Sequence, residues 1–297
     1  MKQIILGTAQ LGLNYGVNNP IGKPSLREAY EILDTAYDNG IKILDTAEVY
    51  GDSEEIIGEY MSKTGKKFNV ITKLSPLNNN NKLFDQIIIN INKSLYNLKL
   101  SSVYGYLVHT FSDVYNNIEI IDILYNEKRN GKIENIGISI YEPEELEYII
   151  EYLSEKVDIV QIPLNIFDLR WVKEDLLLKA NKCGIKIAAR SIYLQGLFFA
   201  DKHVLQKIHP KAYNYVDTLK RLCNKKREYI EQIAMSFVKS VNNIDFVLTG
   251  CENKNQLTKN IEMFNKGIKF SEDEYEFILS EFNDIEEKIY DPRMWNI

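Results

Sequence analysis

Four side chains suited to proton transfer stand at the ends of three successive apolar segments of the sequence. Asp45 and Tyr50 follow one such segment, Lys73 the next and His109 the one after. Each alone has an ordinary explanation, since an aspartate can bind backbone amides, a tyrosine can pack, a lysine can be solvated and a histidine can make one polar contact. Together they are harder to explain in that way, because burying a lysine and an aspartate is costly unless the two form a pair.

As a group, these residue types fit one kind of chemistry. A phenol ordinarily has a pKa of about 10, which is high for efficient proton transfer near neutrality. An ammonium group within hydrogen-bond reach favours the phenolate, and a carboxylate behind it keeps the ammonium charged and in place. An imidazole can orient a carbonyl oxygen or share the proton transfer. The pattern therefore predicts a site that stabilises and protonates a developing alkoxide, as carbonyl reduction requires.

The composition is that of a globular protein and sets several function classes aside. Of 297 residues, 45% are hydrophobic and 26% are charged, and the net charge of −6 argues against a nucleic-acid binder. The three cysteines are far apart in the sequence, which favours a reducing cytoplasm over a disulfide framework. The sequence has no clustered Cys/His pair for a metal site, and residues 1–16 are too polar for a signal peptide or membrane anchor. We therefore expect a cytoplasmic protein without a metal or a membrane partner.

Short β-branched segments alternate with longer segments of helical periodicity along the chain. Ser25 and Glu28 form a capping box at the start of the first helical segment. The predicted strands are 3–9, 41–47, 68–74, 103–109, 133–139, 157–163, 185–191 and 244–250. The predicted helices are 24–40, 54–62, 83–97, 114–129, 143–153, 173–183, 226–240 and 255–265.

Strand followed by helix, repeated in this way, predicts a parallel sheet covered by helices. We predict one (β/α)₈ barrel domain over residues 1–297 rather than an open doubly wound sheet. The open sheet usually carries a Gly-rich dinucleotide loop after its first strand, and the glycines of GTAQLGLNYG (7–16) are spaced wrongly for that loop.

Three segments fall outside this alternation. The asparagine-rich stretch 77–85 is expected to be a polar loop, and an extra helix is expected over about 271–288, followed by a tail to 297. The connection over about 196–225 is long, and long loops at the top face of a barrel are often lids. It is basic, so it either offers charge to a phosphate or is a solvated lid without a ligand; its cations are Lys202, His203, Lys207, His209 and Lys211.

Three motifs resemble the signatures of the aldo/keto reductase family: DTAEVYGDSEEIIGE (45–59), VITK (70–73) and LVH (107–109). The resemblance extends over nearly the whole chain. It implies a (β/α)₈ barrel that binds a nicotinamide cofactor in extended form at the top face without a Rossmann domain. It also implies that Tyr50 is the proton donor, tuned by Lys73 and Asp45, and that His109 orients the substrate carbonyl.

The same resemblance implies a set of cofactor contacts. Gln161 and Ser139 match positions that bind the nicotinamide amide, and Arg190 replaces an aromatic residue that often stacks on the nicotinamide. The guanidinium can stack as well, or it can face a phosphate or an anionic substrate. NADPH is favoured and NADH stays possible, because Gly250 stands where a cation near the 2′-phosphate is common and Lys254 or Lys259 would have to replace it. The remaining expected cofactor contacts are Ser191, Gln195 and Gly196, in a loop resembling the one that wraps the pyrophosphate, and Gln256 and Asn260 near the adenine.

The segment 7–16 and the tail DPRMW (291–295) look more like the branch of the family found in bacterial surface-polysaccharide and sugar pathways. That likeness implies a sugar, sugar phosphate or nucleotide sugar as substrate. Arg293 and Trp295 would then close over the site, unless Trp295 only anchors the C-terminus. Two other functions stay open: a lyase that forms a Schiff base on Lys73, and a non-catalytic relative that senses the bound cofactor. The oligomeric state and the direction of reaction do not follow from the sequence.

Overall fold

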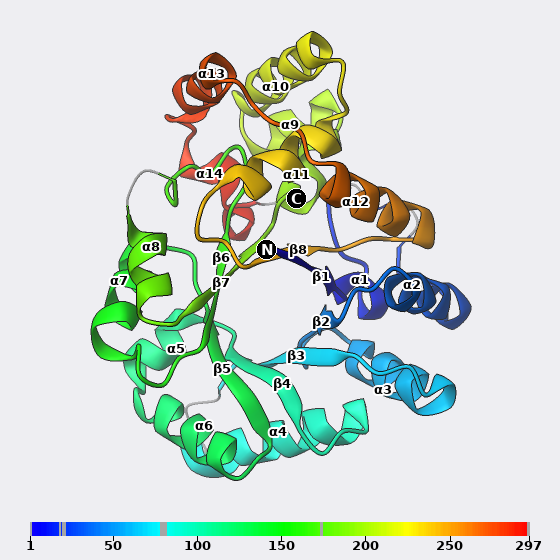
Figure 1. Cartoon of the computed structure of the whole chain (residues 1–297), viewed down its shortest axis with the longest axis vertical. Helices are drawn as coiled ribbons and strands as arrows, with labels where there is room; N and C mark the ends of the chain where they lie inside the picture. The colour runs from blue at the N-terminus through cyan, green and yellow to red at the C-terminus, as the bar shows by residue number, and fades with distance from the viewer. Residues whose placement is uncertain (1, 18, 20–21, 78–81, 173–174, 296–297) are drawn as a thin grey trace.

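The computed structural model describes residues 2–17, 19, 22–77, 82–172 and 175–295. Eight parallel strands close into a barrel in sequence order, with β1 paired to both β2 and β8. Helices surround the barrel when it is viewed down its axis (Figure 1). The predicted (β/α)₈ barrel is therefore confirmed, and the open sheet is excluded.

All eight predicted strands are present, each within a few residues of its expected bounds. Most of their side chains are buried, as expected where helices cover one face and barrel-interior side chains the other. Ile5, Ile43, Ile71, Leu107 and Ile159 form the core inside the barrel together with Ala188 and Phe246. The strands are β1 (Gln3–Gly7), β2 (Ile43–Asp45), β3 (Asn69–Leu74), β4 (Val103–Val108), β5 (Ile133–Ser139), β6 (Ile159–Pro163), β7 (Lys186–Arg190) and β8 (Phe246–Thr249).

The helices bury one face each against the barrel. In α2 (Leu26–Asp38) the capping box of Ser25 and Glu28 is present, and the buried face is Ala29, Ile32, Leu33 and Ala36, while Leu26 is exposed. The other helices in the expected positions are α3 (Ser53–Thr64), α4 (Leu83–Leu98), α7 (Pro143–Tyr152), α8 (Leu176–Lys182), α11 (Ile230–Ser240) and α12 (Lys254–Lys266). A short uncapped helix, α1 (Ala9–Gly12), also follows β1.

Three predicted segments differ from the structure. The long connection expected over 196–225 is helical: η1 (Leu194–Phe199), α9 (Lys202–Ile208) and α10 (Ala212–Lys226) occupy it. The helix expected over 114–129 is two helices, α5 (Phe111–Asn116) and α6 (Glu119–Arg129), because the chain turns at Asn117. The C-terminal helix expected over 271–288 ends early as α13 (Glu272–Phe282), and α14 (Glu287–Tyr290) and η2 (Pro292–Met294) follow it. Of the polar loop 77–85, residues 78–81 lie outside the described residues, as do 173–174 of the expected helix 173–183.

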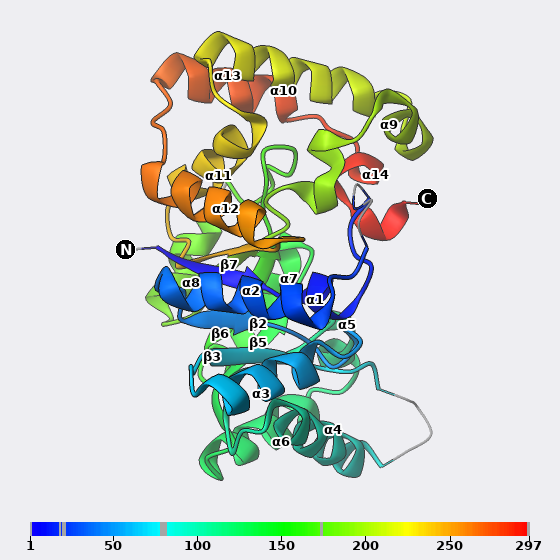
Figure 2. The same cartoon turned by 90° about the vertical axis from the view of Figure 1, so that its right-hand side faces the viewer.

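The position of α10 explains why the basic connection is not a loop. Its apolar residues Val216, Leu219 and Leu222 are buried, and Lys226 at its end binds Glu274 of α13 at 2.7 Å. Both helices lie outside α11 in two perpendicular views (Figures 1 and 2). They form an added layer on one side of the barrel. Among the described residues, none of the helices is long and apolar enough to cross a membrane.

The barrel has two different ends. The N-terminus lies at one end and α14 and the C-terminal tail lie at the other (Figure 2). The polar residues that follow β2, β3 and β4 share the second end, because parallel strands in register finish together.

Candidate active site

A buried ion pair forms the base of the site. Asp45 is the last residue of β2 and Lys73 lies near the end of β3, so neighbouring parallel strands bring them together. The Lys73 Nζ donates to Asp45 Oδ1 at 2.5 Å and to the Thr46 carbonyl at 3.0 Å, and both side chains are almost wholly buried. Burial alone would lower the pKa of Lys73, but the Asp45 carboxylate and the Tyr50 phenol outweigh burial and raise it. The ammonium therefore stays charged.

Tyr50 and His109 lie over this pair. The Lys73 Nζ lies 5.2 Å from the centroid of the Tyr50 ring, and the Tyr50 and His109 rings are 6.1 Å apart and nearly perpendicular. Glycines fix the loop that carries Tyr50: a Cβ on Gly12 would lie 1.7 Å from the Tyr50 carbonyl oxygen, and Gly51 has φ of +59°. The loop can therefore pack directly on α1. The four residues singled out from the sequence all line one cavity.

The environment of His109 keeps its imidazole neutral. Burial lowers its pKa to about 3, and the charges of Lys73 and Arg190 act in the same direction. A neutral imidazole can donate one hydrogen bond to a carbonyl oxygen without adding a charge to the site.

We expect His109 to stay neutral from pH 8 down to about pH 5. The lowered pKa means that the folded state binds fewer protons than the unfolded state, so this group makes folding less favourable as the pH falls below about 6.5. Nitrogen-15 NMR of the imidazoles, assigned with His109→Gln, checks this. A His109 midpoint near 6.5 would contradict it.

The cavity above the ion pair has a volume of about 600 Å³. Gln161, in the middle of β6, is wholly buried there; its Nε2 donates to Asp45 Oδ2, and its Oε1 has no donor. Ser139 ends β5 and is paired in register with Gln161. A buried amide oxygen without a donor is unusual, so this oxygen is free to accept a hydrogen bond from a ligand.

The segment after β7 lies along the same cavity. Ser191, Leu194 and Gln195 have φ of +60°, +47° and +51°, and Gly196 has φ of +91°. Non-glycine residues rarely adopt such a backbone, and clusters of them are typical of ligand-binding segments. Arg190 precedes the segment, donates to the Ile140 carbonyl at 3.0 Å and lies 4.2 Å from the centroid of the Tyr141 ring.

The loop after β8 and the start of α12 line the far part of the cavity. The Asn260 Nδ2 donates to Thr249 Oγ1 at 3.1 Å and to the Gly250 carbonyl at 3.2 Å, and the Tyr193 hydroxyl donates to Asn260 Oδ1 at 3.0 Å. The Gln256 side chain bonds within the loop, to the Glu252 amide at 2.8 Å and the Glu252 carboxylate at 3.2 Å. Of the two lysines expected here, Lys259 lines the cavity, whereas Lys254 forms an ion pair with Glu31 of α2 at 2.8 Å.

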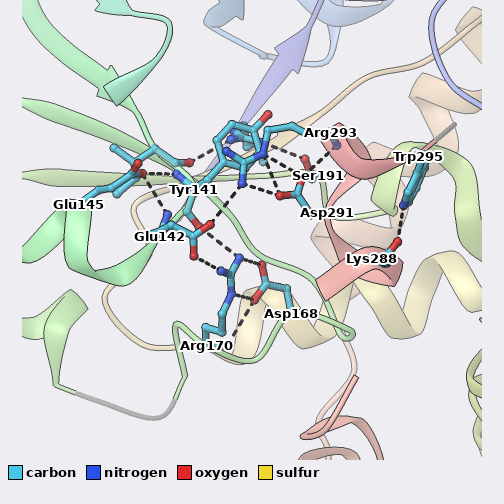
Figure 3. Close-up of polar contacts among 12 residues, drawn as sticks. Tyr141, Glu142, Glu145, Asp168, Arg170, Ser191, Lys288, Asp291, Arg293 and Trp295 are labelled. Atoms are coloured by element: carbon cyan, nitrogen blue, oxygen red, sulfur yellow. Dashed lines mark hydrogen bonds and ion pairs between the residues drawn. The ribbon is translucent and has the colours of Figure 1, made fainter. Parts of the chain in front are cut away.

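The C-terminal tail reaches the cavity through Pro292. The Trp295 indole donates to the Lys288 carbonyl at 3.0 Å, so Trp295 anchors the tail (Figure 3). The Arg293 guanidinium lies 3.6 Å from the centroid of the Tyr141 ring and binds Asp291. Among the residues that the structure describes as lining the cavity, neither Arg293 nor Trp295 is found.

Among the residues that the structure describes, the cavity lining includes none of the five basic residues named on the long connection. His209 and Lys211 both bind Glu286, at 3.2 and 2.7 Å, and Lys202 lies over the Tyr213 ring. The connection instead contributes Phe199, next to the cavity. This segment thus packs against the C-terminal region and is helical rather than a loop, while its role as a lid stays a prediction.

Sequence reasoning missed two tyrosines that line the cavity, Tyr15 and Tyr141. Burial raises the pKa of Tyr15 to about 12, and Tyr50, which lines the same cavity, adds to the effect. Tyr141 lies two residues after the end of β5, and polar residues that follow barrel strands at this end commonly line the active site, so it could have been singled out from the sequence. Tyr15 lies in a segment without periodicity, and no signal in the sequence identified it.

The comparison with known protein families agrees with this geometry. The model of the aldo/keto reductase family matches residues 3–280. The chain belongs to the aldo/keto reductase family. Oxidoreductase chemistry on a small-molecule carbonyl is the activity of this family, with nicotinamide cofactors.

Individual relatives are distant from this aldo/keto reductase. Aldo-keto reductase YhdN of Bacillus subtilis (strain 168) is 31% identical over 170 residues, which cover 52% of this chain and 50% of that protein. Glyoxal reductase of the same organism is 28% identical over 186 residues, 62% of this chain and 64% of that protein. The matches thus span between half and two thirds of these relatives. The solved glycerol dehydrogenase AKR11B4 of Gluconobacter oxydans shares the fold, with a TM-score of 0.73, 23% identity, and coverage of 95% and 93% of the two chains.

Proposed function

We propose that this aldo/keto reductase transfers a hydride between NADPH and the carbonyl or alcohol carbon of a small aldehyde, ketone or sugar-type substrate. The observation that carries the proposal is the buried Asp45–Lys73 ion pair beneath Tyr50, beside a neutral His109, in one cavity. An ion pair buried at a cavity floor is costly to maintain, and such sites are often functional.

Each of the four residues has a distinct task in this proposal. Tyr50 donates a proton to the carbonyl oxygen in reduction and takes it back in oxidation. Lys73 stabilises the phenolate that remains, and Asp45 holds the ammonium in place. His109 donates a hydrogen bond to the same oxygen and orients the carbonyl. The nicotinamide, when bound, supplies the hydride to the carbonyl carbon.

The residues of the cavity fit a nicotinamide cofactor. The unpartnered Gln161 Oε1 can accept from the carboxamide of a nicotinamide, and Ser139 beside it can share that task. The left-handed segment from Ser191 to Gly196 offers backbone groups to phosphates. Gly250, Gln256 and Asn260 complete the proposed cofactor contacts, all on the cavity wall, and Arg190 lines the same wall.

We propose NADPH over NADH because Lys259 is on the cavity wall near Gln256 and Asn260 and offers a charge to the 2′-phosphate. Lys259→Gln is expected to weaken NADPH binding about 5- to 10-fold, the effect of one exposed charge pair, and to change NADH binding less. Fluorescence titration of both nucleotides measures it. Lys254→Gln is the control, since Lys254 is paired with Glu31 outside the cavity. Equal effects on both nucleotides would contradict the role of Lys259.

The substrate is proposed at the level of class. Glyoxal reductase and the NADP(+)-dependent aryl-alcohol dehydrogenase of Phanerodontia chrysosporium are named among the relatives, and both names indicate small carbonyl or alcohol substrates. A place in bacterial sugar or surface-polysaccharide metabolism is proposed from the motifs 7–16 and 291–295, and a cytoplasmic location from the three widely spaced cysteines. A screen of aldehydes, ketones and sugars by the loss of NADPH absorbance tests this. Failure of every compound despite tight nucleotide binding would favour a cofactor sensor.

The lyase alternative fits the site less well. A Schiff base forms on a neutral amine, and lysines used for that purpose have a lowered pKa. The pKa of Lys73 is raised, mainly by Asp45 against the effect of burial, and its ammonium already bonds to Asp45 and the Thr46 carbonyl. Borohydride should therefore trap no substrate on Lys73, and a trapped adduct would revive the lyase.

A further inference from the structure

Three arginines surround the Tyr141 side of the cavity, and they differ in their partners. Arg170 binds the carboxylates of Asp168 and Glu142, and Arg293 binds those of Asp291 and Glu142 (Figure 3). Both charges are thus compensated within the protein. Two of the three guanidinium groups, those of Arg190 and Arg293, lie over the same Tyr141 ring.

Arg190 has no such compensation. Its guanidinium donates to two neutral acceptors, the Ile140 carbonyl at 3.0 Å and Ser191 Oγ at 3.3 Å, and its Nε is buried without a partner. Within the described part of the chain, no carboxylate lies within 4.0 Å of it. A half-buried guanidinium with a free N–H and no anion is costly. Because Arg190 lines the cavity, a ligand can supply the missing anion.

The other ionisable groups at this end of the cavity leave the charge of Arg190 in excess. Lys73 and Asp45 neutralise each other, and His109 is neutral. The other two carboxylates that line the cavity belong to Glu252, before α12, and Glu231, in α11. Glu252 accepts a hydrogen bond from Gln256, and the charge of Glu231 helps to raise the pKa of Tyr193. Among the groups that line the cavity around Tyr50, the charge is therefore net positive. Behind this wall, Arg170 and Arg293 share the three carboxylates of Asp168, Glu142 and Asp291, none of which lines the cavity.

We propose that Arg190 binds an anionic group of the substrate, a carboxylate or a phosphate carried a few atoms from the reacting carbonyl. The inference rests on the proposed oxidoreductase function. Arg190 is the last residue of β7 and lines the same cavity as Tyr50 and His109, on the side of the proposed carbonyl site. A guanidinium has five N–H donors and the two hydrogen bonds of Arg190 use one on each Nη, so a second donor on each Nη is left for a carboxylate or phosphate oxygen. The Tyr141 ring holds the guanidinium plane in place. Tyr15 lines the same cavity and can add a hydrogen bond.

Steady-state kinetics with paired substrates tests the proposal: glyoxylate against glycolaldehyde, and glyceraldehyde 3-phosphate against glyceraldehyde. The wild-type protein is expected to prefer the anionic member of at least one pair by roughly 10- to 100-fold in kcat/KM, the effect of a charge-assisted hydrogen bond. The pair that shows the preference identifies carboxylate or phosphate. Arg190→Gln should remove most of the preference, mainly through KM, and Arg190→Lys should keep part of it.

Arg221→Gln, an exposed change on α10, is the charge-matched control and should keep the full preference. Thermal unfolding of each variant establishes that the fold is intact. A preference that is absent in the wild type, or unchanged in Arg190→Gln, overturns the proposal while the reductase function stands. Weaker NADPH binding in Arg190→Gln without a change in preference also overturns it, because the anion is then the cofactor's pyrophosphate. No turnover of any aldehyde together with no nucleotide binding overturns the function and this inference with it.

Discussion

Tyr50→Phe is expected to lower kcat by about 10²- to 10⁴-fold, the usual effect of removing one proton-transfer group. The nucleotide dissociation constant should hardly change, because the lost hydroxyl acts on the substrate oxygen. The ring keeps its contacts with Lys73 and His109, so the fold should be preserved. Single-turnover rates with the best aldehyde, beside NADPH titrations, measure both quantities.

Tyr15→Phe is the matched control, since Tyr15 is a second phenol in the same cavity. It should have a much smaller effect on kcat than Tyr50→Phe. A Tyr50→Phe protein within a few-fold of wild type, or a Tyr15→Phe protein with the larger loss, would remove Tyr50 from its proposed role.

Lys73→Met is expected to lower both activity and stability. Because both charges of the Lys73–Asp45 pair are buried, removing one leaves an uncompensated carboxylate, which typically costs about 3–5 kcal/mol of unfolding free energy. Turnover should fall by a factor comparable to that of Tyr50→Phe, because the phenolate loses its stabilising charge. Urea denaturation and steady-state kinetics give the two effects.

The double variant Asp45→Asn/Lys73→Met separates stability from catalysis. It has no unpaired buried charge, so it should regain a large part of the lost stability and none of the lost turnover. Recovery of turnover in the double variant would contradict the role of the ammonium. Equal stability of Lys73→Met and wild type would contradict the burial of the pair.

Much of the fold was predictable because its signals are local. The β-branched segments at 133–139 and 68–74 are strands almost to the residue, and Ser25 and Glu28 start α2 as the capping box predicts. The connection after β7 was not predicted, although α10 carries buried residues at helical spacing, Val216, Leu219 and Cys223. Its many basic residues suggested a solvated loop, but most of them lie on the exposed side of helices.

Part of the candidate site was likewise predictable from the sequence and part was not. Strand order alone brings Asp45, Lys73 and His109 to one end of the barrel, so their convergence followed from the sequence. The bond between Gln161 and Asp45 did not, because it joins residues 116 positions apart and depends on side-chain directions. The uncompensated charge of Arg190 was equally hidden, since it depends on which carboxylates the neighbouring arginines bind.

The most direct test of the central claim is isotope transfer from NADPH deuterated at the nicotinamide C4 to an aldehyde that the wild-type protein reduces. Mass spectrometry of the alcohol is expected to find deuterium on the former carbonyl carbon, and Tyr50→Phe should yield almost no labelled product. An alcohol without deuterium, or label transfer at the wild-type rate by Tyr50→Phe, would contradict hydride transfer assisted by Tyr50.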